Sequence, residues 1–376
     1  MYFPKEPSSS ERIFITKNGS SAIYLFLKSL NLPEDSEVIL QAFTCNSVVN
    51  PVLWAGFKPV YSDIDRKTFS IDIESLKSRV TDKTKVVILQ HTFGIPGPVH
   101  EVVEFCRQKK IFVLEDCAHA LGVEVGGRPL GISGDAAIVS FGLEKTLSTK
   151  VGGALLLNNK NIAKKINTQY GSWKYMSYPE TFIWLLNPII RIILRKIPIF
   201  RVSTAVLLSR VGLFNTGFVR KELKGEMPSN ALRLLPGVLA SVVVERLARI
   251  EYNLRHRENI TQVYLNNVFP KGISIADSIR SNLLPLVKFP VVTKDEKQRD
   301  EMRTYLQSEG IYISDWYDPV VYPEETDLKL MRYVKGSCPV AEDISKRVIN
   351  LPTGSYVTTA HAKMICHEIE NFTNSK

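Results

Sequence analysis

A lysine follows closely after an apolar run in the segment Ser140 to Lys145, which reads SFGLEK. A glycine pair, Gly152 and Gly153, comes a few residues later. A lysine on a turn just past a strand can reach into a cleft. When desolvation and nearby positive charge promote loss of its proton, it becomes a nucleophile. The alternative interpretation is that Lys145 is one of many exposed lysines.

An aspartate and a histidine stand three positions apart in the segment Val113 to His119, which reads VLEDCAH. One interpretation is that Asp116 is an ordinary helix N-cap, because aspartate is favoured there. The functional interpretation is that Asp116 faces the pyridine nitrogen of pyridoxal 5′-phosphate (PLP). A carboxylate there keeps the nitrogen protonated, so the ring can accept electron density from a carbanion. His119 would then reach the phenolic oxygen of the ring.

Small residues open a predicted helix at Gly19, Ser20 and Ser21, ahead of the apolar run Ile23 to Leu30. Such a helix start leaves backbone N–H groups open to a phosphate, and the helix dipole adds attraction. The two serine hydroxyls can add donors. The alternative is an ordinary serine N-cap.

A second turn, Gln41 to Ser47, follows the predicted strand Val38 to Leu40. Its side chains, Cys45 among them, can cover one face of a flat ring. The alternative is a plain strand-to-helix connection.

In this order and spacing, the four segments resemble those of the DegT/DnrJ-type sugar aminotransferases, a branch of the fold type I PLP enzymes. The resemblance is detailed from about residue 18 to 158 and returns more weakly at 227–247 and 337–354. Two shorter pieces support it, namely Asp63-Ile64-Asp65 after a predicted strand and the segment Gln90 to Gly94.

The resemblance implies a role for each candidate residue. Lys145 matches the lysine that holds PLP as a Schiff base, and Asp116 matches the carboxylate at the pyridine nitrogen. His119 stands where the family uses Gln or His near the phenolic oxygen. Five residues are implied to hold the phosphate, the last of them from a neighbouring subunit: Gly19, Ser20, Ser21, Ser140 and Asn230.

The sequence departs from the family pattern at two places. Cys45 stands where the family often stacks an aromatic residue on the PLP ring, so stacking must be weaker or come from elsewhere. The segment Trp316 to Pro319 usually precedes a His in the family, and Val320 and Val321 occupy that region here. Relatives that replace the lysine with His are dehydratases, and because this sequence keeps Lys145 we expect transamination.

The implied activity moves an amino group from an amino acid, expected to be glutamate, to a keto group of a nucleotide-linked sugar. Such a step belongs to amino-sugar or surface-polysaccharide biosynthesis. Active sites of this fold usually form between subunits, so we expect a homodimer. Two alternatives stay open: a PLP-dependent lyase or dehydratase of the same fold, and a catalytically silent regulatory protein of that fold.

Short apolar runs alternate with helical segments from about residue 18 to 158, and these elements must position the candidate residues. The alternation predicts an α/β fold with a mostly parallel central sheet and helices on both faces. Ligands bind such sheets at the carboxyl ends of the strands, where the motifs fall. The expected strands are 38–40, 59–61, 86–89, 112–114 and 137–139, and the expected helices are 21–30, 73–79 and 99–109.

The rest of the chain predicts a smaller C-terminal α/β domain. We place the large PLP-binding domain at residues 1–260 and the small domain at 261–376. Residues 237–266 are expected to form a long helix that crosses between the two, since apolar residues recur there at helical spacing. In the small domain the expected strands are 283–289 and 311–314, and the expected helices are 295–309 and 358–372.

The composition fits a soluble globular protein whose 376 residues exceed one core of roughly 250–300. The net charge of +10 is spread along the chain without a nucleic-acid-binding signature. We therefore expect acidic metabolites as partners and no nucleic acid. Five cysteines without metal-ligand spacing predict a reducing compartment and no metal site. With no signal peptide at the start, we expect a cytoplasmic protein.

Residues 171–226 form a hydrophobic, basic insertion, within which residues 182–200 read FIWLLNPIIRIILRKIPIF. Its uncharged run is shorter than the about 20 residues that span a bilayer. Arg191 and Arg195 share one face of a predicted helix whose other face is apolar, as in helices that lie in a membrane interface. We predict a peripheral membrane contact through residues 182–213. The alternative is a helix packed on the protein or at a subunit contact.

Overall fold

A seven-stranded sheet forms the larger part of the fold. The computed structural model describes residues 13–186, 220–267 and 269–374, and the strand order is β1-β10-β9-β6-β5-β2-β4. The strands from β9 to β4 run parallel, whereas β1 with β10 and β10 with β9 pair antiparallel at one edge. The bounds are β1 Ile13–Thr16, β2 Glu37–Gln41, β4 Lys58–Ser62, β5 Thr84–Gln90, β6 Phe112–Asp116, β9 Ala136–Ser140 and β10 Gly153–Leu157. The predicted α/β class and mostly parallel sheet are confirmed.

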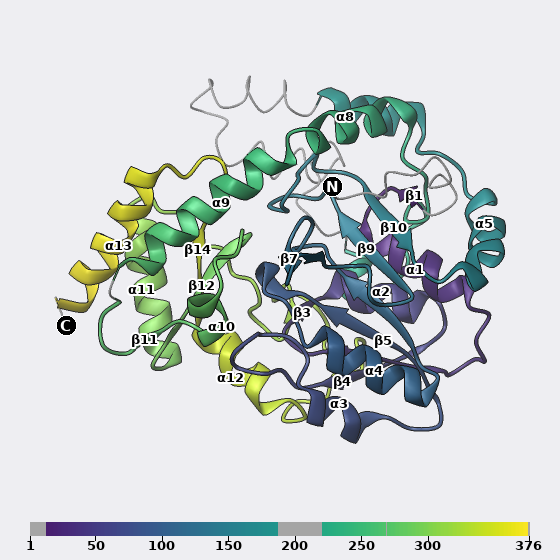
Figure 1. The fold of residues 1–376 in the computed structure, drawn as a ribbon, viewed down its shortest axis with the longest axis horizontal. Coiled ribbons are helices and arrows are strands. Elements are labelled where there is room, and N and C mark those ends of the chain that lie inside the picture. Colours follow the sequence, from purple (N-terminus) through teal and green to yellow (C-terminus); the bar gives the residue numbers. More distant parts are fainter. Residues whose placement is uncertain (1–12, 187–219, 268, 375–376) are drawn as a thin grey trace.

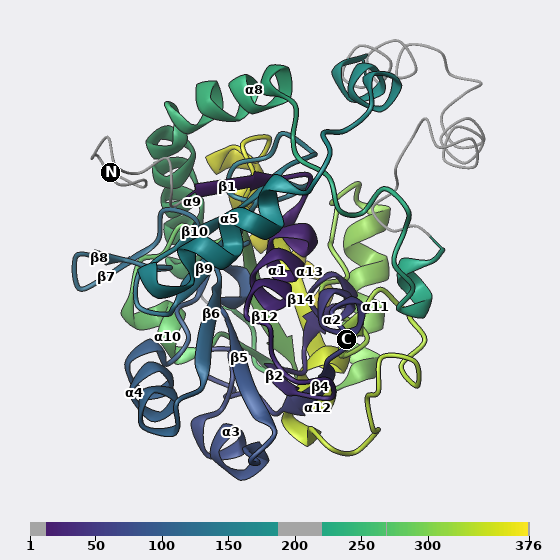
Figure 2. The ribbon, with the colours of Figure 1, turned by 90° about the vertical axis from the view of Figure 1, so that its right-hand side faces the viewer.

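Helices cover both faces of this sheet, as the sequence predicts. Alternate side chains of a strand face opposite sides, so Ile39 of β2 joins one apolar cluster while Val38 and Leu40 join the other. The first cluster packs against α3 and α4 and the second against α1 and α2 (Figures 1 and 2). The helix bounds are α1 Gly19–Ser29, α2 Asn46–Trp54, α3 Ile73–Arg79, α4 Val99–Lys109 and α5 Ala163–Gly171.

A three-stranded antiparallel sheet, β11-β12-β14, organises the C-terminal part (Figure 1). Its strands are β11 Ile273–Ser274, β12 Lys288–Thr293 and β14 Val348–Pro352. Around it lie α10 Asp277–Ser281, α11 Glu296–Ser308, α12 Pro339–Arg347 and α13 Thr359–Asn374. The predicted helices 295–309 and 358–372 are therefore present as α11 and α13.

Two strand predictions in this part are wrong. The expected strand 283–289 begins only at Lys288. Pro285 has no N–H to donate, and the Val287 N–H donates to the Phe93 carbonyl instead of to a neighbouring strand. The expected strand 311–314 is absent. There the Ile311 N–H closes the end of α11, and only Ser314 forms an isolated bridge with Asn350.

The predicted long helix 237–266 is interrupted. It consists of α8 Gly237–Leu247 and α9 Ile250–Leu265, with the break at Ala248 and Arg249. α8 and α9 run in different directions, and α9 descends toward α13 and the small sheet (Figure 1). The chain thus changes direction where it passes from one sheet to the other. The domain boundary at residue 260 stays a prediction.

The insertion is described only at its two ends. A helix over residues 178–186 exposes Phe182 and Leu185, and the rest of the predicted membrane contact at 182–213 lies outside the described residues. No helix in the described part of the chain has the length and apolar character that crossing a bilayer requires.

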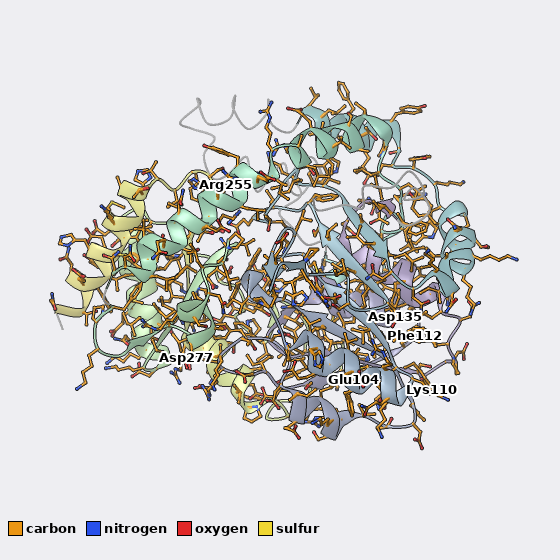
Figure 3. All side chains as sticks on the ribbon, in the orientation of Figure 1. Glu104, Lys110, Phe112, Asp135, Arg255 and Asp277 are labelled. Atoms are coloured by element: carbon orange, nitrogen blue, oxygen red, sulfur yellow. The ribbon has the colours of Figure 1, made fainter. Side chains whose placement is uncertain are left out.

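Strand β6, which ends in Asp116, is held by carboxylates along its length. The Val113 N–H donates to Asp135, which lies beside the start of the strand (2.9 Å; Figure 3). Glu115 is fully buried and accepts three backbone N–H groups, from Gly131, Ser133 and Gly134, at 2.8–3.0 Å. His91 Nε2 lies 3.3 Å from the same carboxylate. Burial raises the pKa of Glu115, but these hydrogen bonds and His91 outweigh it and lower the pKa overall.

We predict that Glu115→Gln lowers the free energy of unfolding by about 3 kcal/mol, since an amide oxygen replaces a carboxylate that accepts several charge-assisted hydrogen bonds. Because the folded-state pKa is lowered, this stabilisation is present above the unfolded-state pKa near 4.5 and is lost as the pH falls further. Denaturant unfolding measures the free energy of unfolding of both proteins, and the difference between them should be full at pH 7 and smaller at about pH 3. Exposed Glu104→Gln is the control and should change stability by less than about 0.5 kcal/mol. Equal effects of the two substitutions would contradict the prediction.

Candidate active site

Lys145 lies five residues beyond β9, at the carboxyl edge of the parallel strands. Its Nζ is 2.7 Å from His119 Nε2 and 4.5 Å from the ring centroid of Trp316. Burial lowers the pKa of Lys145, and Lys288 lowers it further, while Cys45 and Asp116 oppose the shift. The side chain is therefore held in a site that favours the neutral amine, which is the nucleophilic form.

Asp116 ends β6 and lies in the same site. Its side chain is buried, and one carboxylate oxygen accepts the Ala118 N–H at 2.9 Å. Burial raises its pKa, against the effects of that hydrogen bond and of the charges on Lys145 and His91. Asp116 forms no ion pair with any residue that the structure describes. A protonated pyridine nitrogen would supply the cation that this buried carboxylate lacks.

The start of α1 lies directly beside the end of β9. A Cβ placed on Gly19 would sit 3.3 Å from Ser140 Cβ, so these two candidate phosphate residues are brought together. Gly153 makes the approach possible, because a Cβ there would lie 2.5–2.8 Å from the backbone of Asn18 and Gly19. The glycine pair noted in the sequence thus brings the helix start close to the turn from Phe141 to Lys145, termed the catalytic turn because it carries the lysine predicted to hold PLP.

The remaining phosphate candidates are engaged within the chain. The Ser20 hydroxyl donates to the Ser47 carbonyl (2.8 Å), and the Ser21 hydroxyl lies 2.7 Å from both Asn18 Oδ1 and the Ala231 carbonyl. Asn230 is exposed, and its amide donates to Glu180 (3.2 Å). The structure does not bring Asn230 into contact with Lys145. Its role in a neighbouring subunit stays a prediction.

The two positions that depart from the family pattern are neighbours in space. Strand β3 Thr44–Cys45 pairs in parallel with β13 Val321–Tyr322, so Val321 stands opposite Thr44 and Tyr322 opposite Cys45. Upstream in the same segment, Trp316 stacks on His119 with centroids 5.0 Å apart and planes at 8°. The segment that lacks a His thus brings aromatic rings to the face of the site.

Two buried cations near Lys145 were not predicted. Arg257 of α9 donates to the Lys145 carbonyl (3.3 Å) and to Thr353 Oγ1 (2.8 Å). Lys288 Nζ is 3.1 Å from Glu144, and its side chain is almost fully buried. Arg257 shares the buried stripe of α9 with Leu254. A basic residue at a position where the helical periodicity predicts an apolar one was the sequence signal that could have identified Arg257.

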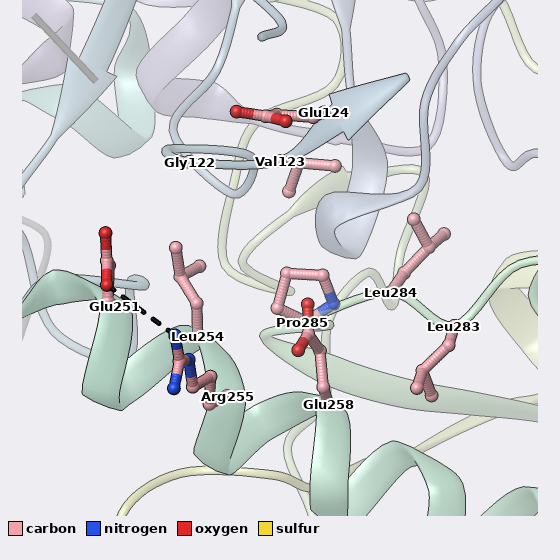
Figure 4. Close-up of a pocket in the computed structure, with 10 residues that line it drawn as sticks. All are labelled: Gly122, Val123, Glu124, Glu251, Leu254, Arg255, Glu258, Leu283, Leu284 and Pro285. Carbon is pink, nitrogen blue, oxygen red and sulfur yellow. Dashed lines mark ion pairs between the residues drawn. The ribbon is translucent and has the colours of Figure 1, made fainter. Parts of the chain in front are cut away.

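The pocket that contains Lys145 has a volume of about 270 Å³ and lies between the catalytic turn, α9 and the small sheet. Basic side chains dominate its lining: Lys145, Arg246, His256, Arg257 and Lys288. A second pocket, of about 310 Å³, lies where α9 faces Leu283 and Pro285 (Figure 4). It contains three glutamates and no lysine, so it cannot form a covalent bond through an amine.

The donor set fits PLP. A neutral-favouring lysine, a buried carboxylate without an ion pair and a histidine stand together at the carboxyl edge of the sheet, beside a helix start that offers N–H groups to a phosphate. The model of the DegT/DnrJ/EryC1/StrS aminotransferase family matches residues 10–370.

The chain belongs to the DegT/DnrJ/EryC1/StrS aminotransferase family. As a member, it is a PLP-dependent aminotransferase, and the resemblance inferred from the motifs is confirmed.

Relatives cover nearly the whole chain. GDP-perosamine synthase from Escherichia coli O157:H7 is 24% identical over 360 residues, which are 96% of this chain and 85% of that protein. The dTDP-4-dehydro-2,3,6-trideoxy-D-glucose 4-aminotransferase of Saccharopolyspora spinosa is 25% identical over 96% of this chain and 84% of its own. The crystal structure of NtdA from Bacillus subtilis with bound cofactor PMP superposes with a TM-score of 0.71 at 20% identity, covering 96% and 73% of the two chains.

We predict that PLP quenches the fluorescence of this aminotransferase mainly through Trp316, whose ring lies 4.5 Å from Lys145 Nζ. The chain has four tryptophans. Trp316→Phe should remove the largest share of the quenching on titration of the cofactor-free protein with PLP, whereas the control Trp173→Phe should remove little. The opposite ranking would show that Trp316 is far from the cofactor.

Proposed function

We propose that this aminotransferase moves an amino group from glutamate to a keto group of a nucleotide-linked sugar, in amino-sugar or surface-polysaccharide biosynthesis. The observation that carries the proposal is the joint placement of Lys145, Asp116 and His119 in one site, in which Asp116 and His119 are buried. Family relatives named for GDP-linked and dTDP-linked sugars support the substrate class. The basic lining of the pocket suits a diphosphate and a dicarboxylate donor.

Each site residue has a distinct task in this proposal. When bound, PLP supplies an electron sink for the carbanion left by loss of a proton. Lys145 Nζ, with its lowered pKa, would take the α-proton of the donor and deliver it to C4′ of the cofactor in the first half-reaction. In the second half-reaction it would move a proton the opposite way, from C4′ to the carbon of the sugar that receives the amino group. General acid–base help of this kind contributes roughly 10²–10⁴-fold. Asp116 would hold the proton at the ring nitrogen of the bound cofactor, and Arg257 fixes the backbone of the catalytic turn through the Lys145 carbonyl.

We predict that borohydride reduction of the PLP-loaded protein attaches the cofactor to Lys145 alone, as peptide mass spectrometry would detect. Lys145→Ala should abolish the attachment and lower glutamate-dependent formation of 2-oxoglutarate by at least about 10²-fold. Asp116→Ala should keep measurable cofactor binding but slow turnover severely. The exposed Lys165→Ala is the control and should behave as the wild type. Full activity of Lys145→Ala would disprove the assignment.

The same assay separates the alternatives. A lyase or dehydratase of the fold would consume substrate without forming 2-oxoglutarate, and a silent regulatory protein would bind PLP without turnover. The sugar is identified by titrating the pyridoxamine form of the protein with a panel of nucleotide-linked keto sugars. Return of the PLP spectrum marks the sugar that accepts the amino group.

We further propose that the protein acts in the cytoplasm as a homodimer that contacts a membrane surface through residues 182–213. The exposed Asn230 suits a role toward a neighbouring subunit. The five cysteines are all free, in keeping with a reducing compartment. The sequence of this segment combines basic residues, Arg191, Arg195 and Lys196 among them, with long apolar runs, a composition that suits a surface of anionic headgroups.

Sedimentation tests the homodimer and the membrane contact. Without vesicles, the protein should sediment at twice the chain mass of 42.4 kDa. With anionic vesicles it should co-sediment. Arg191→Glu/Arg195→Glu should weaken vesicle binding by at least about tenfold, since each basic side chain near an anionic surface contributes about 1 kcal/mol. The control Lys164→Glu/Lys165→Glu carries the same charge change on α5 and should bind as the wild type. Equal binding by both variants would remove the membrane proposal.

A further inference from the structure

The histidine beside Lys145 has a ring whose two nitrogens have different partners. His119 Nδ1 lies 3.1 Å from the backbone nitrogen of Phe93, whose N–H points at it. A backbone N–H can only donate, so Nδ1 must present its lone pair. In the neutral ring the proton then resides on Nε2, which faces Lys145 Nζ at 2.7 Å.

We infer that the Phe93 backbone amide locks His119 in the Nε2–H form, making it a permanent hydrogen-bond donor toward Lys145 and toward the phenolic oxygen of the bound cofactor. The inference rests on the proposed function and deepens it, because it assigns a positioning role to a residue outside the four motifs. It also excludes His119 as the base of the reaction. Lys145 is therefore the group that carries the proton.

The short contact with Lys145 has a consequence for the lysine. Two N–H donors cannot point at each other across 2.7 Å. With the proton on His119 Nε2, the Lys145 nitrogen must accept, and it does so only as a neutral amine. His119 therefore keeps the free lysine in its nucleophilic state.

The groups around His119 act in the same direction. Burial lowers its pKa well below the usual range, and the nearby charges of Lys288 and Arg257 lower it further. A protonated ring would also direct an Nδ1–H at the Phe93 N–H. On the remaining sides lie Trp316, stacked on the ring, and the Tyr317 hydroxyl, 3.4 Å from Nε2. Neither of them is an anion, so none of the described residues that contact His119 supplies a carboxylate to stabilise the charged ring.

Phe93 cannot turn its amide away. Its backbone is left-handed (φ 59°), its ring is fully buried, and its carbonyl accepts the Val287 N–H at 2.9 Å. Gly94 follows with φ 95°, and a Cβ there would lie 3.1 Å from the His119 carbonyl oxygen. The backbone of the segment Gln90 to Gly94 thus has a task of its own, beside the contact of His91 with Glu115. It holds one N–H in place.

A glutamine can reproduce this arrangement. Its Oε1 would accept the Phe93 N–H, which fixes the orientation of the amide, and its Nε2 would donate to the same partners as His119 Nε2. His119→Gln should therefore keep the function. His119→Met has a similar length but neither the acceptor nor the donor, and it should lose the function.

Nitrogen NMR of the cofactor-free protein tests the lock directly. The chain has six histidines, and the signal missing from His119→Gln identifies His119 in ¹⁵N-histidine-labelled protein. The inference predicts a protonated Nε2 and an unprotonated Nδ1 that stay unchanged from about pH 5 to 8, where an ordinary histidine titrates. A proton on Nδ1, or titration to the doubly protonated ring in this range, would overturn it.

Turnover by the PLP-loaded enzyme adds the functional readout. His119→Gln should stay within about tenfold of wild-type kcat, and His119→Met should fall by about 10²-fold or more, as when one preorganised donor is removed. Equal losses in both variants would overturn the donor role. If the wild type formed no 2-oxoglutarate at all, the proposed function would fail, while the NMR result would still decide the state of His119.

Discussion

Desolvation of Lys145 is the constraint on which the site depends. An amine taken out of water loses its proton more readily, and here burial, rather than any single neighbour, is the largest cause of its lowered pKa. The same burial raises the pKa of Asp116 and lowers that of His119. Desolvation therefore shifts the pKa of all three groups, although Lys145 keeps partial solvent exposure where it lines the pocket.

Both parts of the fold contribute to the desolvation of Lys145, Asp116 and His119. The large sheet supplies Asp116, His119 and Lys145 from strand ends that meet at one edge, as parallel strands must. The C-terminal part supplies Trp316 as a cover, and α9 supplies Arg257, which binds the backbone of the catalytic turn. Movement of the two parts relative to each other would thus alter the pKa of the lysine as well as access to it.

Much of the large sheet could be predicted from the sequence, because its strands are buried on both faces and appear as continuous apolar runs. β2 and β5 are examples. The small sheet was harder. Leu283 to Val287 is as apolar as a strand, but it packs without a ladder partner, and only tertiary contacts reveal this. The break at Ala248 was invisible for a similar reason, since helical periodicity continues through it while the chain turns toward the small sheet.

The residues of the site also divide into those that the sequence reveals and those that only the structure reveals. Lys145, Asp116 and His119 were recognisable because chemistry restricts residue type and spacing, and the structure brings them together. Phe93 was not recognisable as a functional residue, because it acts through its backbone and its side chain carries no signal. Trp316 was noticed only as part of a segment lacking a His, and its place over His119 depends on the pairing of β13 with β3.

The most direct measurement is a crystal structure of the protein loaded with PLP. The assignment predicts electron density continuous from Lys145 Nζ into the cofactor, with the ring nitrogen at hydrogen-bond distance from Asp116 and the phenolic oxygen beside His119. Cofactor density joined to another lysine, or a ring nitrogen turned away from Asp116, would contradict it.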